Sequence, residues 1–319
     1  MCDTKKRGVF LCTVLSNDSL CDEHYRMTLE VDETSQPFAS CSAGQFVQVQ
    51  CRKPVQQAGA IVNEWPQDQP PHFSQPELLG NETLLRRPIS LAGRKKVNGK
   101  TRLELIYRVV GVGTRWLSGC EIGDSVSIIG PLGNSMPLTS RPRAILVGGG
   151  VGIPPMIYMS QILHEAGKET VAFCGVRGEN LLPLTAGYEQ PSTKPVATLC
   201  FSEFSRHDTP VVIASDDGSI GFHGLVTRAL EKYLDSCGWQ PEEVTAYSCG
   251  PEPMMKALAE LCRKRHIECY LSLERHMACG MGTCQSCIVK IKDSSKECGW
   301  SYKLCCTDGP VFRAQDVLW

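Results

Sequence analysis

The sequence predicts a multi-domain fold made of an antiparallel β-barrel domain, a doubly wound α/β domain and a small Cys-rich domain. The chain has 319 residues and 42% hydrophobic content, more than one average domain needs. Near residue 142 the pattern changes from short alternating strands to strands that alternate with helices, and cysteines crowd the C-terminal part. The expected domains are 1–142, 143–268 and 269–319.

The N-terminal part carries short runs in which apolar and polar residues alternate. Examples are FLCTVLS, YRMTLEV, QFVQVQC and RLELIYRVV. This alternation, with its β-branched residues, predicts the strands of an antiparallel barrel. Segment 54–82 is rich in Pro and Gln and has no sustained period, so we expect it to be an insertion that runs over the surface.

The middle part alternates apolar strands with helical runs. The strand AILVGG leads through a Gly-rich turn into the helical run PPMIYMSQILHEAG, and further strands are VAFCGV, PVVIAS and EVTAYSCG. Strands that alternate with helices predict a parallel, doubly wound sheet.

Charge and hydropathy argue against two classes of protein. The 33 basic and 34 acidic residues give a net charge of -1, which lacks the basic footprint of a nucleic-acid binder. No apolar stretch reaches the roughly 18 residues that cross a membrane, and no secretory leader is evident. We therefore expect a soluble, cytoplasmic protein, in which the 18 cysteines serve metal ligation better than disulfides.

The most specific motif is RHMACGMGTCQSC in the Cys-rich part. Its C-x4-C-x2-C spacing, typical of plant-type [2Fe-2S] sites, is formed by Cys279, Cys284 and Cys287. The cluster needs a fourth thiolate, for which the candidates are Cys298, Cys305 and Cys306. A zinc site also uses four thiolates, but it usually pairs two short CxxC hooks. The spacing therefore favours the iron–sulfur cluster.

Two strand-to-helix turns in the α/β part suit a dinucleotide. The first contains Gly149, Gly150 and Gly152, whose missing β-carbons would let a pyrophosphate approach the helix N-terminus. A tight packing turn is the alternative. The second lies at the carboxyl end of another strand, where open sheets place ligands, and contains Cys249, Gly250 and Pro251.

Asp216 and Asp217 follow the strand PVVIAS. A carboxylate at this edge could accept hydrogen bonds from ribose hydroxyls and would repel a 2'-phosphate, which favours NAD over NADP. A solvated turn is the alternative for either residue taken singly.

A flavin signal lies in the barrel part. The RRPIS segment supplies Arg87 and Ser90, and YRVVGVGT supplies Gly113 and Thr114. A cation, a hydroxyl and a Gly-Thr turn are groups that a flavin with a pyrophosphate tail would use. Arg87 by itself could equally be a surface charge.

These motifs carry a resemblance to a known family. A barrel with R-P-x-S, followed by a G-x-G turn and then C-G-P, resembles the ferredoxin-NADP reductase superfamily. With RHMACGMGTCQSC and the ending CCTDGPVF, the chain is similar to the electron-transfer subunits of NAD-dependent dihydroorotate dehydrogenases. The similarity spans nearly the whole chain except 54–82.

The resemblance implies three cofactors: FAD, a [2Fe-2S] cluster and NAD. Arg87 would neutralise the FAD phosphate, Pro88 and Ile89 would line the isoalloxazine, and Ser90 would hydrogen-bond near flavin N5. The expected catalytic residues are Ser90 and Cys249. Cys249 would flank the nicotinamide. Further FAD contacts would come from Tyr107, Arg108, Val109, Gly113 and Thr114. NAD contacts would come from Gly149, Gly150, Gly152, Asp216, Cys249, Gly250 and Pro251.

The same resemblance assigns the fourth cluster thiolate to Cys306, although the adjacent Cys305 leaves this choice open. Ile89 stands where the broader superfamily has an aromatic residue, so an aromatic stacking partner is not expected from that position.

The implied function is that of an NAD-dependent flavin and iron–sulfur oxidoreductase of pyrimidine biosynthesis. It would pass electrons between an FMN-containing dihydroorotate dehydrogenase catalytic subunit and NAD, as part of a hetero-oligomer. A TIM barrel of about 250 residues would not fit into this chain beside the other sites. The alternatives are a subunit of an NAD(P)H:ferredoxin or sulfur-reducing hydrogenase complex, and a non-catalytic metal-binding redox sensor.

Overall fold

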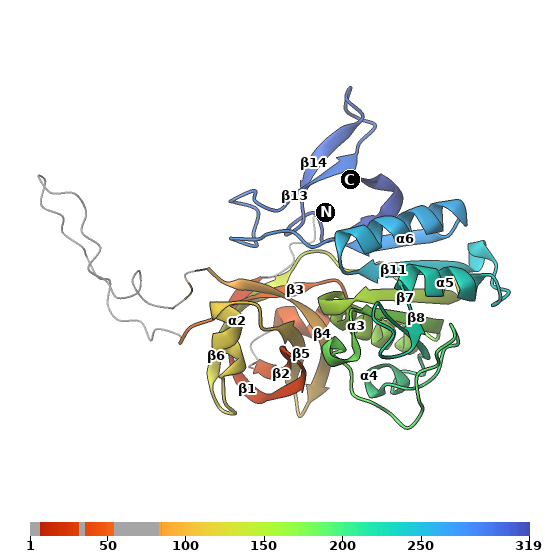
Figure 1. The fold of residues 1–319 in the computed structure, drawn as a ribbon. Helices are drawn as coiled ribbons and strands as arrows, with labels where there is room; N and C mark the ends of the chain where they lie inside the picture. Colours follow the sequence, from red (N-terminus) through yellow and green to blue (C-terminus); the bar gives the residue numbers. More distant parts are fainter. Residues whose placement is uncertain (1–6, 32–35, 54–82, 84) are drawn as a thin grey trace, which may run out of the picture.

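The computed structural model describes residues 7–31, 36–53, 83 and 85–319. The predicted insertion 54–82 lies outside these residues. Within them the chain forms a closed barrel, a seven-stranded sheet with helices on both faces and a small three-stranded sheet (Figure 1). The predicted three-part fold is confirmed.

The barrel is antiparallel and closes in the order β1-β2-β5-β4-β3-β6. Its strands are β1 (Gly8–Cys21), β2 (His24–Val31), β3 (Phe46–Val49), β4 (Arg87–Val97), β5 (Lys100–Arg108) and β6 (Ser125–Leu132). A short 3-10 helix, η1 (Gln36–Ser40), precedes β3. The segment at Gly113 and Thr114, expected as a turn, instead opens helix α2 (Val112–Ser118). The backbone N–H of Val110 donates to the Thr114 hydroxyl at 2.9 Å, which fixes the entry to this helix.

Strand β3 has two different faces because side chains alternate along a strand. Val47 and Val49 are fully buried in the barrel core. Phe46 belongs to a second core, which it shares with residues of the seven-stranded sheet. Gln48 alternates with Val47 and Val49, so it shares the outward face with Phe46. This face turns toward the other two parts of the molecule.

The large sheet has the order β10-β9-β8-β7-β11-β12-β15. Its strands are β7 (Arg143–Gly149), β8 (Glu169–Val176), β9 (Val211–Ser215), β10 (Phe222–His223), β11 (Val244–Cys249), β12 (Glu268–Ser272) and β15 (Val311–Arg313). All neighbours are parallel except β15, which pairs antiparallel with β12. The sheet therefore contains strands from both sides of residue 268.

Helices cover both faces of this sheet, as in a doubly wound fold. They are α3 (Ile153–Glu165), α4 (Ser202–Ser205), α5 (Val226–Leu234) and α6 (Glu252–Lys264). The buried side chains of α3 share one core with the barrel, whereas those of α5 and α6 share the other core with the Cys-rich part. Short 3-10 helices form the connections η2 (Gly150–Gly152), η3 (Glu179–Leu181) and η4 (Pro241–Glu243).

The Cys-rich part forms a small sheet in the order β14-β13-β16. Its strands are β13 (Ile288–Lys292), β14 (Trp300–Leu304) and β16 (Val317–Leu318), with the 3-10 helix η5 (Ala314–Asp316) before the last strand. Because β15 joins the large sheet and β16 the small one, a single short segment ties both sheets together.

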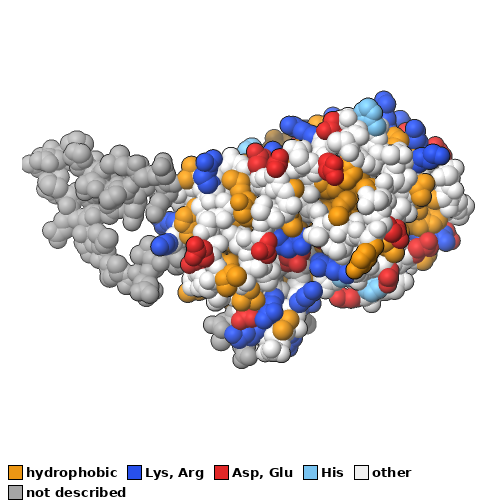
Figure 2. All heavy atoms as spheres, turned by 60° about the horizontal axis from the view of Figure 1, so that its bottom comes forward, with side chains coloured by type: hydrophobic (Ala, Val, Ile, Leu, Met, Phe, Trp, Pro, Cys, Tyr) orange, Lys and Arg blue, Asp and Glu red, His pale blue; other side chains and the backbone are white. Residues whose placement is uncertain are grey.

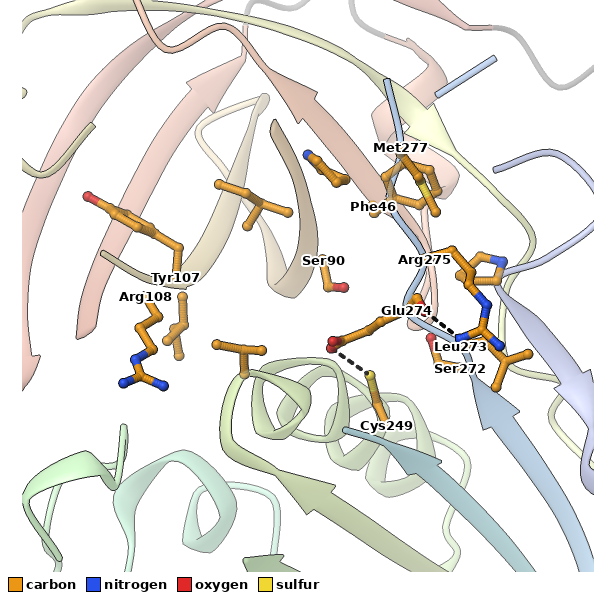
Figure 3. Close-up of a pocket in the computed structure, with 15 residues that line it drawn as sticks. Phe46, Ser90, Tyr107, Arg108, Cys249, Ser272, Leu273, Glu274, Arg275 and Met277 are labelled. Carbon is orange, nitrogen blue, oxygen red and sulfur yellow. Dashed lines mark hydrogen bonds between the residues drawn. The ribbon is translucent and has the colours of Figure 1, made fainter. Parts of the chain in front are cut away.

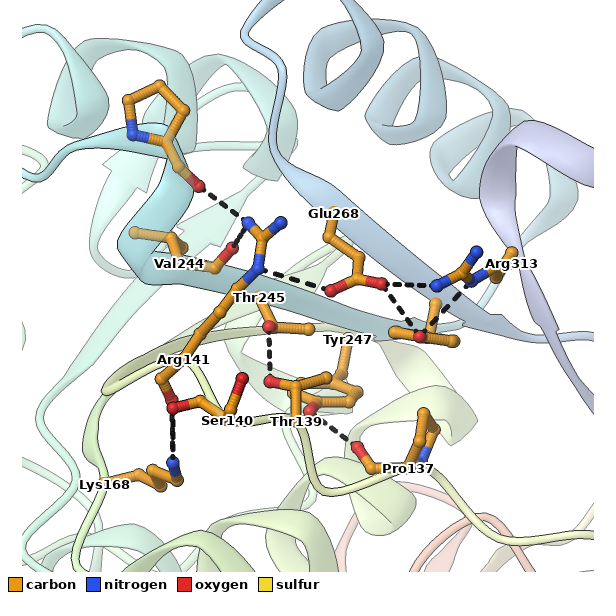
Figure 4. A network of polar contacts seen from close by, with 12 residues as sticks. Pro137, Thr139, Ser140, Arg141, Lys168, Val244, Thr245, Tyr247, Glu268 and Arg313 are labelled. Atoms are coloured by element: carbon orange, nitrogen blue, oxygen red, sulfur yellow. Dashed lines mark hydrogen bonds and ion pairs between the residues drawn. The ribbon is translucent and has the colours of Figure 1, made fainter.

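Polar contacts fix the connection between the barrel and the large sheet (Figure 4). Arg141, just before β7, forms an ion pair with Glu268 at 3.3 Å and donates to the Val244 carbonyl at 2.7 Å. Glu268 also accepts from Arg313 of β15 at 2.9 Å. The Tyr247 hydroxyl donates to the Pro137 carbonyl at 2.7 Å. These contacts hold β11, β12 and β15 against the incoming chain.

In the described residues, no helix combines the length and apolar character needed to cross a membrane. On the face shown in Figure 2, Lys and Arg side chains are interspersed with Asp and Glu side chains. This mixed surface agrees with the net charge of -1.

Candidate functional site: two adjoining cavities and a cysteine loop

Two cavities open where the barrel meets the large sheet. The barrel cavity, of about 250 Å³, lies between β4, β5, the end of β11 and the segment after β12 (Figure 3). The sheet cavity, of about 510 Å³, lies over the carboxyl ends of the parallel strands. Arg108, Val151 and Glu274 line both cavities. Ligands in the two cavities would therefore meet at this shared wall.

The barrel cavity collects six of the expected site residues: Pro88, Ile89, Ser90, Tyr107, Arg108 and Cys249. Sequence reasoning missed Phe46, which also lines it and lies opposite Ser90 in the β3–β4 register. The aromatic ring that position 89 lacks is therefore supplied by the neighbouring strand. The signal was faint, because a single Phe in an apolar strand is usually a core residue.

Tyr107, which lines the barrel cavity, is held in place by two contacts. Its hydroxyl donates to Asn17 Oδ1 at 2.9 Å, and its ring stacks on Tyr25 with a centroid distance of 5.9 Å. Burial raises the pKa of the Tyr107 hydroxyl well above its usual value. This side chain therefore offers a rigid, neutral surface rather than a charge.

The remaining flavin candidates, Arg87, Val109, Gly113 and Thr114, do not line the barrel cavity. Arg87 Nε lies 3.3 Å from the position that a β-carbon of Gly113 would occupy, so α2 and the RRPIS strand are in direct contact. Thr114 lies in the same helix. Val109 lines a separate shallow pocket together with Tyr25. The structure thus brings Arg87 and Gly113 together, whereas Val109 lines a different pocket, to which Arg115 and Ser118 of α2 also contribute.

The sheet cavity is lined by Gly149, Gly150, Asp216 and Pro251, as expected for the nucleotide. Gly152 and Gly250 are not part of its wall. They let the two turns pack tightly instead. A β-carbon on Gly152 would lie 2.2 Å from the Cys249 carbonyl oxygen, and Gly250 adopts a φ of +147°. Both turns therefore depend on glycine for their close approach.

The two aspartates after β9 have different environments. Asp217 Oδ1 accepts from the Ser219 backbone N–H at 2.9 Å and from the Ser219 hydroxyl at 2.7 Å, and these bonds lower its pKa. Asp217 thus stabilises a turn. Asp216 is exposed and lines the sheet cavity. Of the two, Asp216 is the carboxylate that a ligand in this cavity can reach.

Glu274 is a second residue that sequence reasoning missed. It accepts a hydrogen bond from the buried Cys249 thiol, with 3.8 Å between Sγ and Oε1 (Figure 3). Solvent reaches Glu274 through the cavities, yet the surrounding walls desolvate its carboxylate and raise its pKa. It follows β12 closely, so the rule that ligands bind at the carboxyl ends of parallel strands could have identified it.

The cluster motif forms a loop between Glu274 and β13. Two backbone N–H groups of this loop, from Met281 and Cys284, donate to Cys279 Sγ at 3.4 Å each. A hydrogen bond with Ser286 lowers the pKa of the Cys284 thiol to about 6. Gly280 and Gly282 have φ values of +71° and +94°, which glycine adopts without strain. The loop therefore already directs donors at sulfur, as a thiolate site requires.

The motif cysteines approach one another in pairs. Besides Ser286, the Cys279 thiol influences the pKa of the Cys284 thiol, and besides burial, the Cys287 thiol raises the pKa of the Cys306 thiol, so the members of each pair lie close together. In the part of the chain that the structure describes, no three metal-binding side chains converge as a single ion would need. Two pairs of thiols are the donor set that a cluster of two irons takes, two thiolates for each iron.

The three candidates for the fourth ligand differ in position. Burial raises the pKa of the Cys306 thiol, and the nearby thiols of Cys287 and Cys279 raise it further. Cys305 is fully buried, and its backbone N–H donates to the Cys287 carbonyl at 3.0 Å. Cys298 is exposed and donates to the Trp300 carbonyl. Besides burial, Cys287 also raises the pKa of Cys305, but among the three candidates only Cys306 is influenced by a cysteine of each pair, Cys287 and Cys279.

The barrel and the doubly wound sheet form a fold of the ferredoxin reductase type, to which a small Cys-rich part is added. Its fold is similar to a solved NADH-dependent reduced ferredoxin-NADP oxidoreductase, with a TM-score of 0.69 and 23% identity over 97% of this chain and 90% of that one. The ferredoxin reductase of carbazole 1,9a-dioxygenase gives a TM-score of 0.55 and 18% identity over 82% and 67% of the two chains.

Sequence comparison specifies the family. Residues 274–318 match the iron–sulfur cluster binding domain of dihydroorotate dehydrogenase B, and residues 146–260 match the oxidoreductase NAD-binding domain. The electron transfer subunit of dihydroorotate dehydrogenase B (NAD+) from Bacillus caldolyticus is 36% identical over 82% of this chain and 90% of its own. That from Caldanaerobacter subterraneus is 32% identical over 96% of each. The chain belongs to this family of electron transfer subunits, which confirms the resemblance drawn from its motifs. These relatives do not favour the hydrogenase and redox-sensor alternatives.

Proposed function

We propose that this chain is the electron-transfer subunit of a cytoplasmic, NAD-dependent dihydroorotate dehydrogenase of pyrimidine biosynthesis. FAD would bind in the barrel cavity, NAD in the sheet cavity and a [2Fe-2S] cluster in the cysteine loop. The observation that carries the proposal is the continuity of the three sites. Both cavities meet at Glu274, and the chain runs from Glu274 directly into the loop that begins at Cys279.

The side chains around the barrel cavity suit the flavin. Arg87 would neutralise phosphate beside α2, and the Ser90 hydroxyl would hydrogen-bond at the reacting edge of the ring. Phe46 and Tyr107 supply flat apolar surface on its sides. When bound, FAD supplies the change between two-electron and one-electron transfer, with NAD as the hydride carrier and the cluster as the one-electron carrier. Further flavin contacts are assigned to Pro88, Ile89, Arg108, Val109, Gly113 and Thr114.

The side chains around the sheet cavity suit NAD. The backbone at Gly149 and Gly150 can approach a pyrophosphate closely, because neither residue has a β-carbon. Asp216 would accept hydrogen bonds from ribose hydroxyls and repel a 2'-phosphate. Cys249 and Glu274 stand at the meeting point of the two cavities, where they would position the nicotinamide against the flavin. Gly152, Gly250 and Pro251 shape the turns that hold this arrangement.

The four thiolates are assigned to Cys279, Cys284, Cys287 and Cys306. Cys284 is exposed, whereas Cys287 and Cys306 are buried, so the cluster would approach the surface at Cys284. Met281 and Ile288, which are 46% and 42% exposed, supply apolar surface on the same loop and its following strand. We propose that an FMN-containing catalytic subunit docks here.

Composition and reconstitution test this proposal. Protein purified without oxygen should contain one FAD, two irons and two acid-labile sulfides per chain. Mixed with an FMN-containing dihydroorotate-oxidising subunit, it should reduce NAD at the expense of dihydroorotate, which the FMN subunit alone should not do. A chain free of iron or flavin would refute the cofactor assignment. A cofactor-loaded chain that binds a hydrogenase subunit instead would refute the partner.

A further inference from the structure

Gln48 is a buried amide without a hydrogen-bond partner. Its side chain, on the outward face of β3, has no exposed surface. Neither Oε1 nor Nε2 has a hydrogen-bond partner among the described residues. Burial of an amide without a partner costs free energy, and native proteins rarely leave such a group unpaired. The position therefore requires an explanation.

The location of Gln48 explains why its amide lacks a partner within the protein. It lies opposite Pro88 in the β3–β4 register, and Pro88 lines the barrel cavity. On its other side it lies against the cysteine loop. A β-carbon on Gly280 would lie 2.7 Å from Gln48 Cγ and 2.8 Å from Nε2. The orphaned amide thus stands between the wall of the proposed flavin site and the loop that carries Cys279.

The loop permits this approach only because residue 280 is glycine. Gly280 is buried and has a φ of +71°. Any side chain at 280 would enter the space that the Gln48 amide occupies. The conformation of the loop and the position of the amide are therefore matched to each other.

We infer that Gln48 donates a hydrogen bond from Nε2 to a sulfur atom of the iron–sulfur group held by the loop, and thereby raises its reduction potential. This inference rests on the proposed function. Sulfide and thiolate sulfur accept hydrogen bonds, and such bonds are among the features that set the potential of a cluster. Cys279 Sγ already accepts two backbone N–H groups on the loop side. Gln48 adds a donor from the barrel side, where the flavin would lie.

The test is Gln48→Met in the complete protein, purified without oxygen with its flavin and cluster. Methionine matches glutamine in length and removes the donor. A hydrogen bond to a charged acceptor is strong enough that its loss should lower the one-electron reduction equilibrium constant roughly tenfold, or about 59 mV. An electron paramagnetic resonance titration measures this shift, and the signal of the reduced cluster should change as well.

Gln45→Met is the matched control. Gln45 is also buried, but its Oε1 accepts from Ser42 N–H at 3.0 Å and its Nε2 donates to the Gly133 carbonyl at 3.2 Å. Its replacement should lower the melting temperature and leave the cluster potential unchanged. Gln48→Met should shift the cluster potential, and it should lower the melting temperature less than Gln45→Met, because no protein group loses a hydrogen-bond partner.

The outcomes distinguish a failure of the proposed function from a failure of the inference about Gln48. Wild-type protein without iron and sulfide would overturn the proposed function and this inference with it. If wild-type protein holds the cluster but Gln48→Met keeps its potential and its resonance signal, Gln48 is a packing residue and only this inference fails. Should Gln48→Met lose its cluster, Gln48→Glu decides. A carboxylate of the same size lacks the amide donor, so the potential of Gln48→Glu should lie below the wild-type value, and an unchanged value would overturn the inference.

Discussion

Gly152→Ala tests the contact between the two nucleotide-site turns. Gly152 has φ and ψ of -84° and -7°, a conformation open to alanine, so the backbone angles are no obstacle. The obstacle is space. The new β-carbon would lie 2.2 Å from the Cys249 carbonyl oxygen and 2.5 Å from Gly250 N, well inside the ordinary contact distance of 3.4 Å.

The cost can be judged from what surrounds the new methyl group. Insertion of one carbon into a packed interior costs about 1–3 kcal/mol when side chains can yield. Here both close atoms belong to the backbone at the end of a central strand, β11. We therefore expect a loss of about 3 kcal/mol, which corresponds to a fall in melting temperature of roughly 6–12 °C. The turns that hold NAD would also separate, so the KM for NADH should rise.

Thermal unfolding and steady-state kinetics with an artificial dye measure both effects. The matched control is Gly111→Ala, because Gly111 has an extended φ of -175° and nothing within 4 Å of the new β-carbon. Its melting temperature and KM should stay near the wild-type values. If Gly152→Ala melts with the wild type and binds NADH equally well, the close packing of the two turns is refuted.

Three further predictions address single groups. Asp216→Arg should raise the KM for NADH and lower the KM for NADPH by about tenfold each, because one charge interaction contributes about 1.4 kcal/mol. Steady-state kinetics measures both constants. An unchanged coenzyme preference would exclude Asp216 as the determinant. Cys284→Ser should abolish the cluster's visible absorbance but keep dye-linked flavin reduction by NADH. Cys298→Ser changes an exposed thiol outside both pairs, so it should keep both the absorbance and the dye-linked reduction. Burial, and then Arg206, lower the pKa of His207 to about 4 from the usual 6.5. The imidazole of His207 therefore binds a proton more readily in the unfolded chain than in the folded one. The free energy of unfolding should fall as the pH drops from 6.5 toward 4, by about 1 kcal/mol after allowance for partial exposure. Urea midpoints of His207→Gln should depend less on pH in this window, and an identical dependence would contradict the assignment.

The sequence by itself determined the parts of this protein that depend on local pattern. The alternation of strands, the change of period near residue 142 and the spacing of Cys279, Cys284 and Cys287 are properties of neighbouring residues. Each predicted an element or motif that the structure contains. The family followed from the same motifs, because glycine turns and cysteine spacings are constrained by the groups they hold.

Only the tertiary structure decided which distant residues meet. Phe46 carries no local signal that separates it from an ordinary strand residue, and Glu274 has only its position after β12, yet barrel closure and the β12 register place both on one cavity. Cys305 and Cys306 are adjacent in sequence, and only the path of the loop shows which thiol faces Cys287. Gln48 is one polar residue in a strand until the cysteine loop folds against it. In each case the decisive contact joins segments far apart in the chain, and no local pattern records such a contact.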